Sequence, residues 1–211
     1  MGHVVLLGDS IFDNGAYVNG GPDVVAQLRQ KLSAGWNAEL LAVDGSVMAD
    51  VPRQVDKIPS EATHLVVSMG GNDALRESSV LTDPVRSVAE SLLKLSEVHE
   101  RFCAEYGSTL DTILRRALPT AVCTIYDVRY PDAVERKIAK TALSVINDCI
   151  VREAVVRGLP IIDLRLVCDE DADFANAIEP SERGGDKIAA AIASVLSEHD
   201  FSRAQSAIYA S

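Results

Sequence analysis

Five short apolar runs, each followed by glycine or polar residues, constrain the fold of this 211-residue chain more than any other feature. The runs cover residues 4–7, 38–43, 65–69, 121–125 and 159–164. Runs this short that end at turn-forming residues are typical of strands buried on both faces, and the segments between them carry apolar residues at helical spacing. Strands that alternate with helices form a parallel sheet that right-handed crossovers cover on both faces. We therefore expect an α/β fold, a three-layer α/β/α sandwich with a flavodoxin-like parallel sheet of about five strands in the order 2-1-3-4-5.

The longer helical segments and the absence of linkers define the domain organisation. Asp83-Pro84 is expected to start a helix, since Asp caps well and Pro suits the first turn, and Gly107 is expected to break that helix. A long helical pattern covers residues 132–157. We expect residues 1–198 to form a single domain and residues 199–211 to form a C-terminal tail.

Composition excludes several classes of partner. The net charge of −11 argues against binding to nucleic acid or to an anionic membrane surface, because both require basic patches. No window is apolar for long enough to span a bilayer, and no signal peptide is recognisable. The cysteines are widely spaced, so we expect reduced thiols rather than disulfides or a metal site, and a cytoplasmic location. They are Cys103, Cys123, Cys149 and Cys168. The oligomeric state is not readable from the sequence.

Polar residues follow four of the predicted strands, at the sheet edge where ligands bind in such folds. They are Asp9-Ser10, Asp44-Gly45, Gly71-Asn72-Asp73 and Tyr126-Asp127. Ser10 can act as a nucleophile, and the N–H groups of Ser10 and Gly45 and the Asn72 side-chain amide can bind an oxyanion. Each residue alone has a simpler interpretation, in which Ser10 caps a helical turn, Gly45 forms a turn and Asn72 forms an Asx turn.

Taken together and in this order, these segments resemble the SGNH (GDSL-type) hydrolase superfamily. Gly8-Asp9-Ser10 matches its first block, Gly45 its second and Gly70-Gly71-Asn72-Asp73 its third. The fourth block, Asp-x-x-His-Pro before the last helix, corresponds here to residues 176–180. The resemblance covers nearly the whole chain and implies hydrolysis of esters or related acyl groups, with no cofactor and no metal.

The fourth block departs from the family pattern, because Glu179 stands where the family has its catalytic His and Asn176 where it has the orienting Asp. A carboxylate can accept the serine proton, and burial would raise its pKa and make it a better base at neutral pH. Asn176 can donate its amide to Glu179, whereas an Asp there would repel it. The simpler interpretation of Glu179 is a carboxylate at a helix N-terminus.

Other groups are less suitable as the base. None of the four histidines (His3, His64, His99, His199) is expected near Ser10. Asp171 and Asp173, in an acidic loop, are alternative carboxylates. Asp9, Asp13 and Asp73 are expected to support their turns.

We therefore expect a cytoplasmic serine hydrolase, an esterase that forms an acyl-enzyme on Ser10 with Glu179 as base and acts on a small-molecule ester. Loop residues expected to line its pocket are Ile11, Tyr17, Met48, Leu75, Tyr126 and Tyr130. The alternative is a catalytically inactive protein of the same fold that binds a carboxylate, acyl or sugar ligand. A nucleotide binder is disfavoured because no glycine-rich phosphate loop is present.

Overall fold

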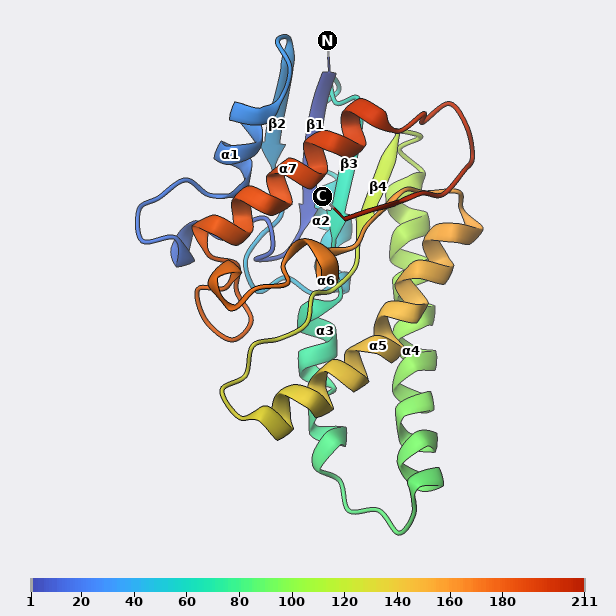
Figure 1. The fold of residues 1–211 in the computed structure, drawn as a ribbon. Helices are drawn as coiled ribbons and strands as arrows, with labels where there is room; N and C mark the ends of the chain where they lie inside the picture. Colours follow the sequence, from blue (N-terminus) through green and yellow to red (C-terminus); the bar gives the residue numbers. More distant parts are fainter. Residues whose placement is uncertain (1, 211) are drawn as a thin grey trace.

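A parallel sheet lies between two layers of helices in the computed structural model, which describes residues 2–210 (Figure 1). The strands are β1 Gly2–Gly8, β2 Trp36–Leu40, β3 His64–Ser68, β4 Thr120–Cys123, β5 Ile161–Ile162 and β6 Ile208–Tyr209. The helices are α1 Val24–Lys31, α2 Val51–Val55, α3 Gly71–Arg76, α4 Val88–Leu114, α5 Ala133–Val156, α6 Leu164–Val167 and α7 Glu182–Glu198. Short 3-10 helices are η1 Gly15–Tyr17, η2 Met48–Asp50, η3 Ser78–Thr82 and η4 Asp171–Asp173. No helix within residues 2–210 combines the length and the apolar character that crossing a membrane requires.

The strand order is β2-β1-β3-β4-β5-β6, and every neighbouring pair is parallel. The predicted three-layer sandwich and the order of its first five strands are confirmed, but the sheet has a sixth strand. β6 comes from the segment that was expected to be a tail. A strand of only two residues is too short to produce an apolar pattern that identifies it in the sequence. It pairs with β5 in the register Ile161↔Ile208.

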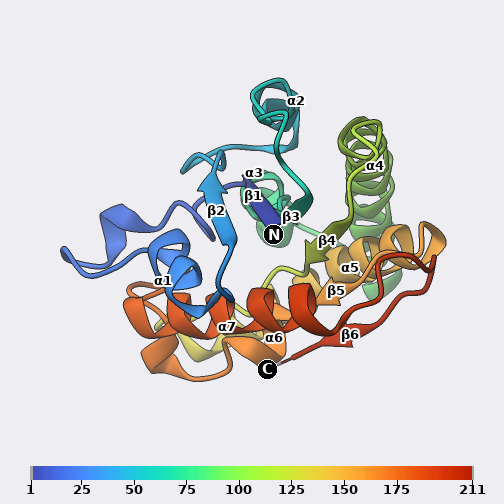
Figure 2. The same ribbon diagram turned by 90° about the horizontal axis from the view of Figure 1, so that it is seen from above.

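Two apolar clusters cover the two faces of the sheet. In β1, Val4 and Leu6 point to one cluster while Val5 and Leu7 point to the other, and all four side chains are fully buried. This alternation is the period-two geometry of a strand buried on both faces. Helices α1 and α7 cover one face, and α2, α4 and α5 cover the other (Figure 2).

Helix α4 differs from its predicted form at two positions. It starts at Val88, because the Ser87 side chain accepts the Glu90 N–H, while Asp83 pairs with Lys94 instead of capping. Gly107 does not break the helix. A Cβ at Gly107 would lie 2.7 Å from Glu153 Oε2, so this glycine lets α5 approach α4 closely.

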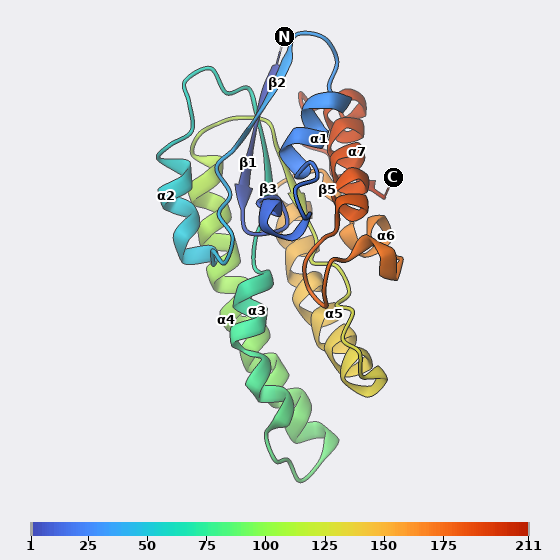
Figure 3. The ribbon, with the colours of Figure 1, turned by 90° about the vertical axis from the view of Figure 1, so that its left-hand side faces the viewer.

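The carboxyl ends of the strands and the starts of three helices share one end of the molecule. Helix α3 and the first halves of α4 and α5 extend beyond the sheet there (Figure 3). Side chains from these helices can therefore enclose space next to the turn that follows β1.

Candidate active site

Ser10 lies in a tight turn directly after β1. The turn is closed by the N–H groups of Phe12 and Asp13, which both donate to the Asp9 carbonyl at 3.1 Å. The strand must end in glycine, because Gly8 has φ +130° and a Cβ there would lie 1.7 Å from the Ser68 carbonyl oxygen. The Ser10 side chain is thereby presented at the carboxyl edge of the sheet, as predicted.

The Gln54 side chain on α2 holds the end of β1 through two hydrogen bonds to the Gly8 backbone, as a neighbouring strand would. Its Oε1 accepts the Gly8 N–H at 2.8 Å and its Nε2 donates to the Gly8 carbonyl at 2.8 Å. Both groups are buried, so the two hydrogen bonds satisfy polar groups that water cannot reach. Sequence reasoning missed this residue, because a single Gln in a short helix has no pattern that reveals its partner.

The loop after β2 is held beside the Ser10 turn. The Val43 N–H donates to the Gly8 carbonyl at 3.1 Å, and the Asn72 amide donates to the Ser46 carbonyl at 2.9 Å. The Asp73 carboxylate accepts the Met48 N–H at 3.1 Å, which is the supporting role expected of it. Gly45 therefore lies in a loop whose flanking residues are fixed to β1 and to the start of α3.

Three potential oxyanion donors lie on the segments that follow β1, β2 and β3. The N–H groups of Ser10 and Gly45 have no hydrogen-bond acceptor within residues 2–210. The Asn72 amide uses one hydrogen on Ser46 and has a second one available. Gly45 adopts φ +75°, a backbone conformation that favours glycine. Free N–H groups of this kind can bind a developing oxyanion, although Gly45, unlike Ser10 and Asn72, is not among the residues that line the cavity described below.

Glu179 is carried by a compact loop before α7. The Ala175 N–H donates to the Glu179 carbonyl at 2.9 Å, and the Tyr126 hydroxyl donates to the Ile178 carbonyl. Asn14, which is fully buried in the turn after Ser10, donates to the Pro180 carbonyl at 3.3 Å. This hydrogen bond joins the turn that contains Ser10 to the loop that contains Glu179. Sequence reasoning did not select Asn14.

Asn176 contacts the backbone of Glu179. Its Oδ1 accepts the N–H of Ile178 at 2.9 Å and that of Glu179 at 3.0 Å, and its side chain is exposed. Within the described residues, no hydrogen bond joins its amide to the Glu179 carboxylate. Asn176 was expected to donate its amide to the Glu179 side chain. Its side chain instead forms an Asx turn that shapes the loop.

The Glu179 side chain is 7% exposed, and its Oε2 is buried without a hydrogen-bond partner. Burial raises the pKa of Glu179, the nearby Ser10 hydroxyl lowers it as a potential hydrogen-bond donor, and the negative charge of Asp44 raises it, with a net increase. Within residues 2–210, no hydrogen bond of ordinary geometry joins the Ser10 hydroxyl to the Glu179 carboxylate. A buried carboxylate with a raised pKa next to a serine hydroxyl is chemically suited to accept its proton.

Two further carboxylates lie near Ser10. Burial raises the pKa of Asp9 to about 7, opposed by the Ile11 N–H and reinforced by the charges of Glu179, Asp73 and Asp44. Burial also raises the pKa of Asp73. No lysine or arginine forms an ion pair with these carboxylates or with Glu179 among the described residues, so no salt bridge holds these carboxyl groups in their charged forms.

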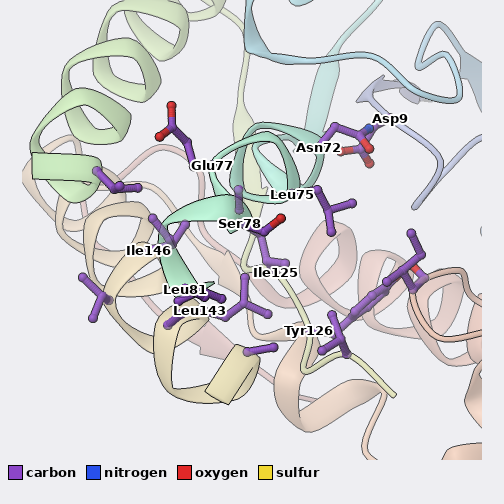
Figure 4. Close-up of a pocket in the computed structure, with 18 of the residues that line it drawn as sticks. Asp9, Asn72, Leu75, Glu77, Ser78, Leu81, Ile125, Tyr126, Leu143 and Ile146 are labelled. Atoms are coloured by element: carbon purple, nitrogen blue, oxygen red, sulfur yellow. The ribbon is translucent and has the colours of Figure 1, made fainter. Parts of the chain in front are cut away.

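A cavity starts at this cluster and continues between helices. Ser10, Asn72 and Glu179 line it at one end together with Asp9. Its walls are formed by α3, η3, α4 and α5, and Figure 4 shows Leu75, Leu81, Ile125, Leu143 and Ile146 arranged around it. The cavity can therefore hold an apolar group whose reacting end is next to Ser10.

Four of the six predicted pocket residues line this cavity, namely Ile11, Leu75, Tyr126 and Tyr130. Met48 does not, because its side chain is fully buried in the core under α2 and α4. Tyr17 does not either; its hydroxyl donates to Asp44 Oδ2 at 2.9 Å. The wall from α4 and α5 was not predicted, because the sequence does not reveal how far these helices extend past the sheet.

The alternative bases lie elsewhere. No histidine lines the cavity in the described part of the chain, and His3 faces Glu39 at the opposite end of β1. Asp171 pairs with Arg129, and Asp173 is fully buried between Arg183 and Lys187. Residues 2–210 contain no group of three or more potential metal ligands. Three carboxylates line the cavity in the described part of the chain, namely Asp9, Glu77 and Glu179. Glu77 forms an ion pair with Arg101, whereas Glu179 has Ser10 as a neighbour.

Comparison with known proteins gives a consistent result. The GDSL-like lipase/acylhydrolase family matches residues 6–187. An extracellular lipase from Streptomyces rimosus has a similar structure, with a TM-score of 0.65, 17% identity and coverage of 89% of this chain and 96% of that one. A lipase/acylhydrolase from Enterococcus faecalis also has a TM-score of 0.65, with 18% identity and coverage of 92% and 94%. These identities support the shared fold alone. No curated protein matches the chain.

Proposed function

Since the chain belongs to the GDSL-like lipase/acylhydrolase family, we propose that it is a serine esterase that uses Ser10 as nucleophile and Glu179 as base. The observation that carries the proposal is the buried Glu179 carboxylate, which lines one cavity with Ser10 and Asn72 and has a raised pKa. A base whose pKa is closer to neutral pH accepts a serine proton more readily than an exposed carboxylate does.

In the proposed reaction, Ser10 Oγ attacks the ester carbonyl while its proton moves to Glu179. The oxyanion that forms is bound by the N–H groups of Ser10 and Gly45 and by the Asn72 amide. When the tetrahedral intermediate collapses, the alcohol leaves with the proton from Glu179 and an acyl group remains on Ser10. Water then attacks the acyl-enzyme while Glu179 accepts its proton, and Glu179 returns this proton to Ser10 Oγ as the bond to the acyl group breaks and the carboxylic acid is released.

The substrate that fits best is a small-molecule ester with an aliphatic acyl chain. The cavity beyond Ser10 is lined mainly by apolar side chains of α3, η3, α4 and α5. Burial of each methylene group contributes about 0.8 kcal/mol, so an acyl chain placed there adds binding energy that an acetyl group lacks.

The proposal is tested with a fluorophosphonate probe and with p-nitrophenyl butyrate. We expect labelling of Ser10 and turnover in the unchanged protein, and neither in Ser10→Ala. Glu179→Gln is expected to reduce kcat by roughly 10²- to 10⁴-fold, the range for loss of a general base. Because Glu179 must be deprotonated to act, kcat/KM should rise with pH through its raised pKa. Ser87→Ala, which removes the exposed helix cap of α4 outside the cavity, is the control.

A second candidate is an inactive protein that binds an acyl or carboxylate ligand in the same cavity. The absence of a histidine from the cavity lining within residues 2–210 favours it. Lack of probe labelling, combined with saturable binding of a fatty acid, would support this candidate and rule out the hydrolase.

A further inference from the structure

We propose that Asp13 and Tyr17 clamp Asp44, so that Asp44 positions the Gly45 N–H toward Ser10 and keeps its own negative charge facing Glu179. The inference rests on the proposed function, and it assigns roles to three residues outside the reacting groups. It makes Asp44 a positioning residue, because nothing places its side chain on the substrate.

The clamp joins the loops that follow β1 and β2. Asp13 Oδ2 accepts the Asp44 N–H at 2.9 Å, and the Tyr17 hydroxyl donates to Asp44 Oδ2 at 2.9 Å. Asp44 is thereby held at its backbone and at its side chain by two residues of the turn that carries Ser10. The residues of the clamp are about 30 positions apart in the sequence, and all of them lie at the carboxyl edge of the sheet.

The next residue after the clamp is Gly45, whose N–H is one of the proposed oxyanion donors. On the other side of Gly45, the Ser46 carbonyl accepts the Asn72 amide and the Met48 N–H is bound by Asp73. Without Asp13 and Tyr17, the segment before Gly45 would keep only the more distant Val43 N–H, which donates to the Gly8 carbonyl at 3.1 Å. Since oxyanion donors act through a preorganised position, loosening one side should reduce the rate more than it reduces substrate binding.

The Asp44 carboxylate also acts on the base. Burial raises the pKa of Glu179 most, and the charge of Asp44 adds to that increase. The hydrogen bond to Asp44 raises the pKa of Tyr17 to about 12, with further contributions from burial and from the charges of Glu179 and Asp44. Tyr17 therefore remains a hydrogen-bond donor throughout the pH range of an assay. The polar or titratable groups near Glu179 come from four segments: Ser10 and Asp9, Tyr17, Asp44 and Tyr126. None of them is a cation, so Asp44 is not neutralised by a nearby basic side chain.

Asp44→Asn separates charge from position, because the amide oxygen can still accept the Tyr17 hydroxyl. We expect the pKa of Glu179, followed by carboxyl ¹³C NMR and assigned by its absence in Glu179→Gln, to fall in Asp44→Asn. The acid limb of kcat/KM against pH should move to lower pH in the same variant. Asp56→Asn changes an exposed carboxylate at the end of α2 that has no ion-pair partner within residues 2–210, and it should leave both unchanged. An unchanged Glu179 pKa in Asp44→Asn would overturn the electrostatic part of the inference.

Tyr17→Phe tests the clamp itself. We expect kcat to fall about ten-fold with KM nearly unchanged, the pattern for a less well-placed oxyanion donor. The matched control is Tyr209→Phe, which removes a tyrosine hydroxyl at the distant β6 edge. Equal kcat in Tyr17→Phe and the unchanged protein would overturn the positioning part. If the unchanged protein is not labelled by fluorophosphonate, the proposed function fails, while the NMR titration still decides whether Asp44 acts on Glu179.

Discussion

Asp9 directly precedes Ser10, the proposed nucleophile, and the burial of Asp9 has a consequence for stability. The folded-state pKa of about 7 lies above the ordinary value of 3.8. A carboxyl group with a raised folded pKa contributes stability that is present below its unfolded pKa and is lost as pH rises through the folded pKa. From about pH 4 to 7, Asp9 should therefore make the protein progressively less stable.

Asp9→Asn removes that charge and keeps an oxygen for the Ile11 N–H. We expect the variant to match the unchanged protein at pH 4 and to exceed its free energy of unfolding at pH 8 by up to about 4 kcal/mol. Urea denaturation at the two pH values measures this, with Asp56→Asn as the control. A difference between variant and unchanged protein that does not depend on pH would contradict the prediction.

Helix α5 has a different role, because its first half forms one wall of the cavity. Ala139, Ala142 and Leu143 all face the space that continues from Ser10. In Ala142→Trp, the indole should fill part of this space and shorten the acyl chain that fits. We expect kcat/KM for p-nitrophenyl octanoate to fall more than ten-fold while that for p-nitrophenyl acetate stays within about two-fold, since roughly two buried methylene groups account for a ten-fold change.

Ser144→Trp provides the matched control, because Ser144 is exposed on the same helix. It should leave the preference between the two esters unchanged. A parallel loss for both esters in Ala142→Trp would indicate damage to the fold and not a shorter cavity, and would contradict the assignment of α5 as the acyl-binding wall.

The elements differ in how well the sequence predicted them. The strand β1 and the turn at Ser10 were predictable, because four buried apolar residues stop at a glycine that the neighbouring Ser68 carbonyl requires. The start of α4 was misplaced because Asp83-Pro84 and Ser87, four residues after Asp83, are equally local signals for a helix start, and only Ser87 caps the helix. Gly107 was misread because its role is contact with α5, which lies far away in sequence.

The candidate site follows the same distinction. Ser10, Asn72 and Glu179 could be selected because each belongs to a short motif, and the structure brings all three to one cavity. Asn14 and Gln54 could not be selected, because their side chains bind backbone groups of residues that are distant in the sequence and come near only in the folded chain. The catalytic roles of the three motif residues stay predictions until the variants are measured.

At the scale of the whole molecule, the last residues of the described chain complete the sheet. The N–H groups of Ile161 and Asp163 donate to the carbonyls of Ala207 and Tyr209, each at 2.8 Å. Removal of residues 204–211 would leave both N–H groups without acceptors and expose β5 as an edge. We expect a loss of about 2–3 kcal/mol and a Tm lower by roughly 4–12 °C, measured by thermal unfolding, with increased aggregation.

Ile208→Ser is the control for this truncation, because the Ile208 side chain is exposed while its backbone pairs with β5. It should keep Tm within about 2 °C of the unchanged protein. An unchanged Tm after truncation would mean that β6 adds nothing to the stability of the sheet.

The strand order also determines when the site can exist during synthesis. The ribosome makes Ser10 before either neighbour of β1, which lies between β2 and β3 and is buried only once both have been made. Glu179 follows nearly 170 residues later. A nascent chain that has folded only this first part of the sheet would therefore carry the proposed nucleophile without its proposed base. The proposed hydrolytic activity would require synthesis to have passed residue 179.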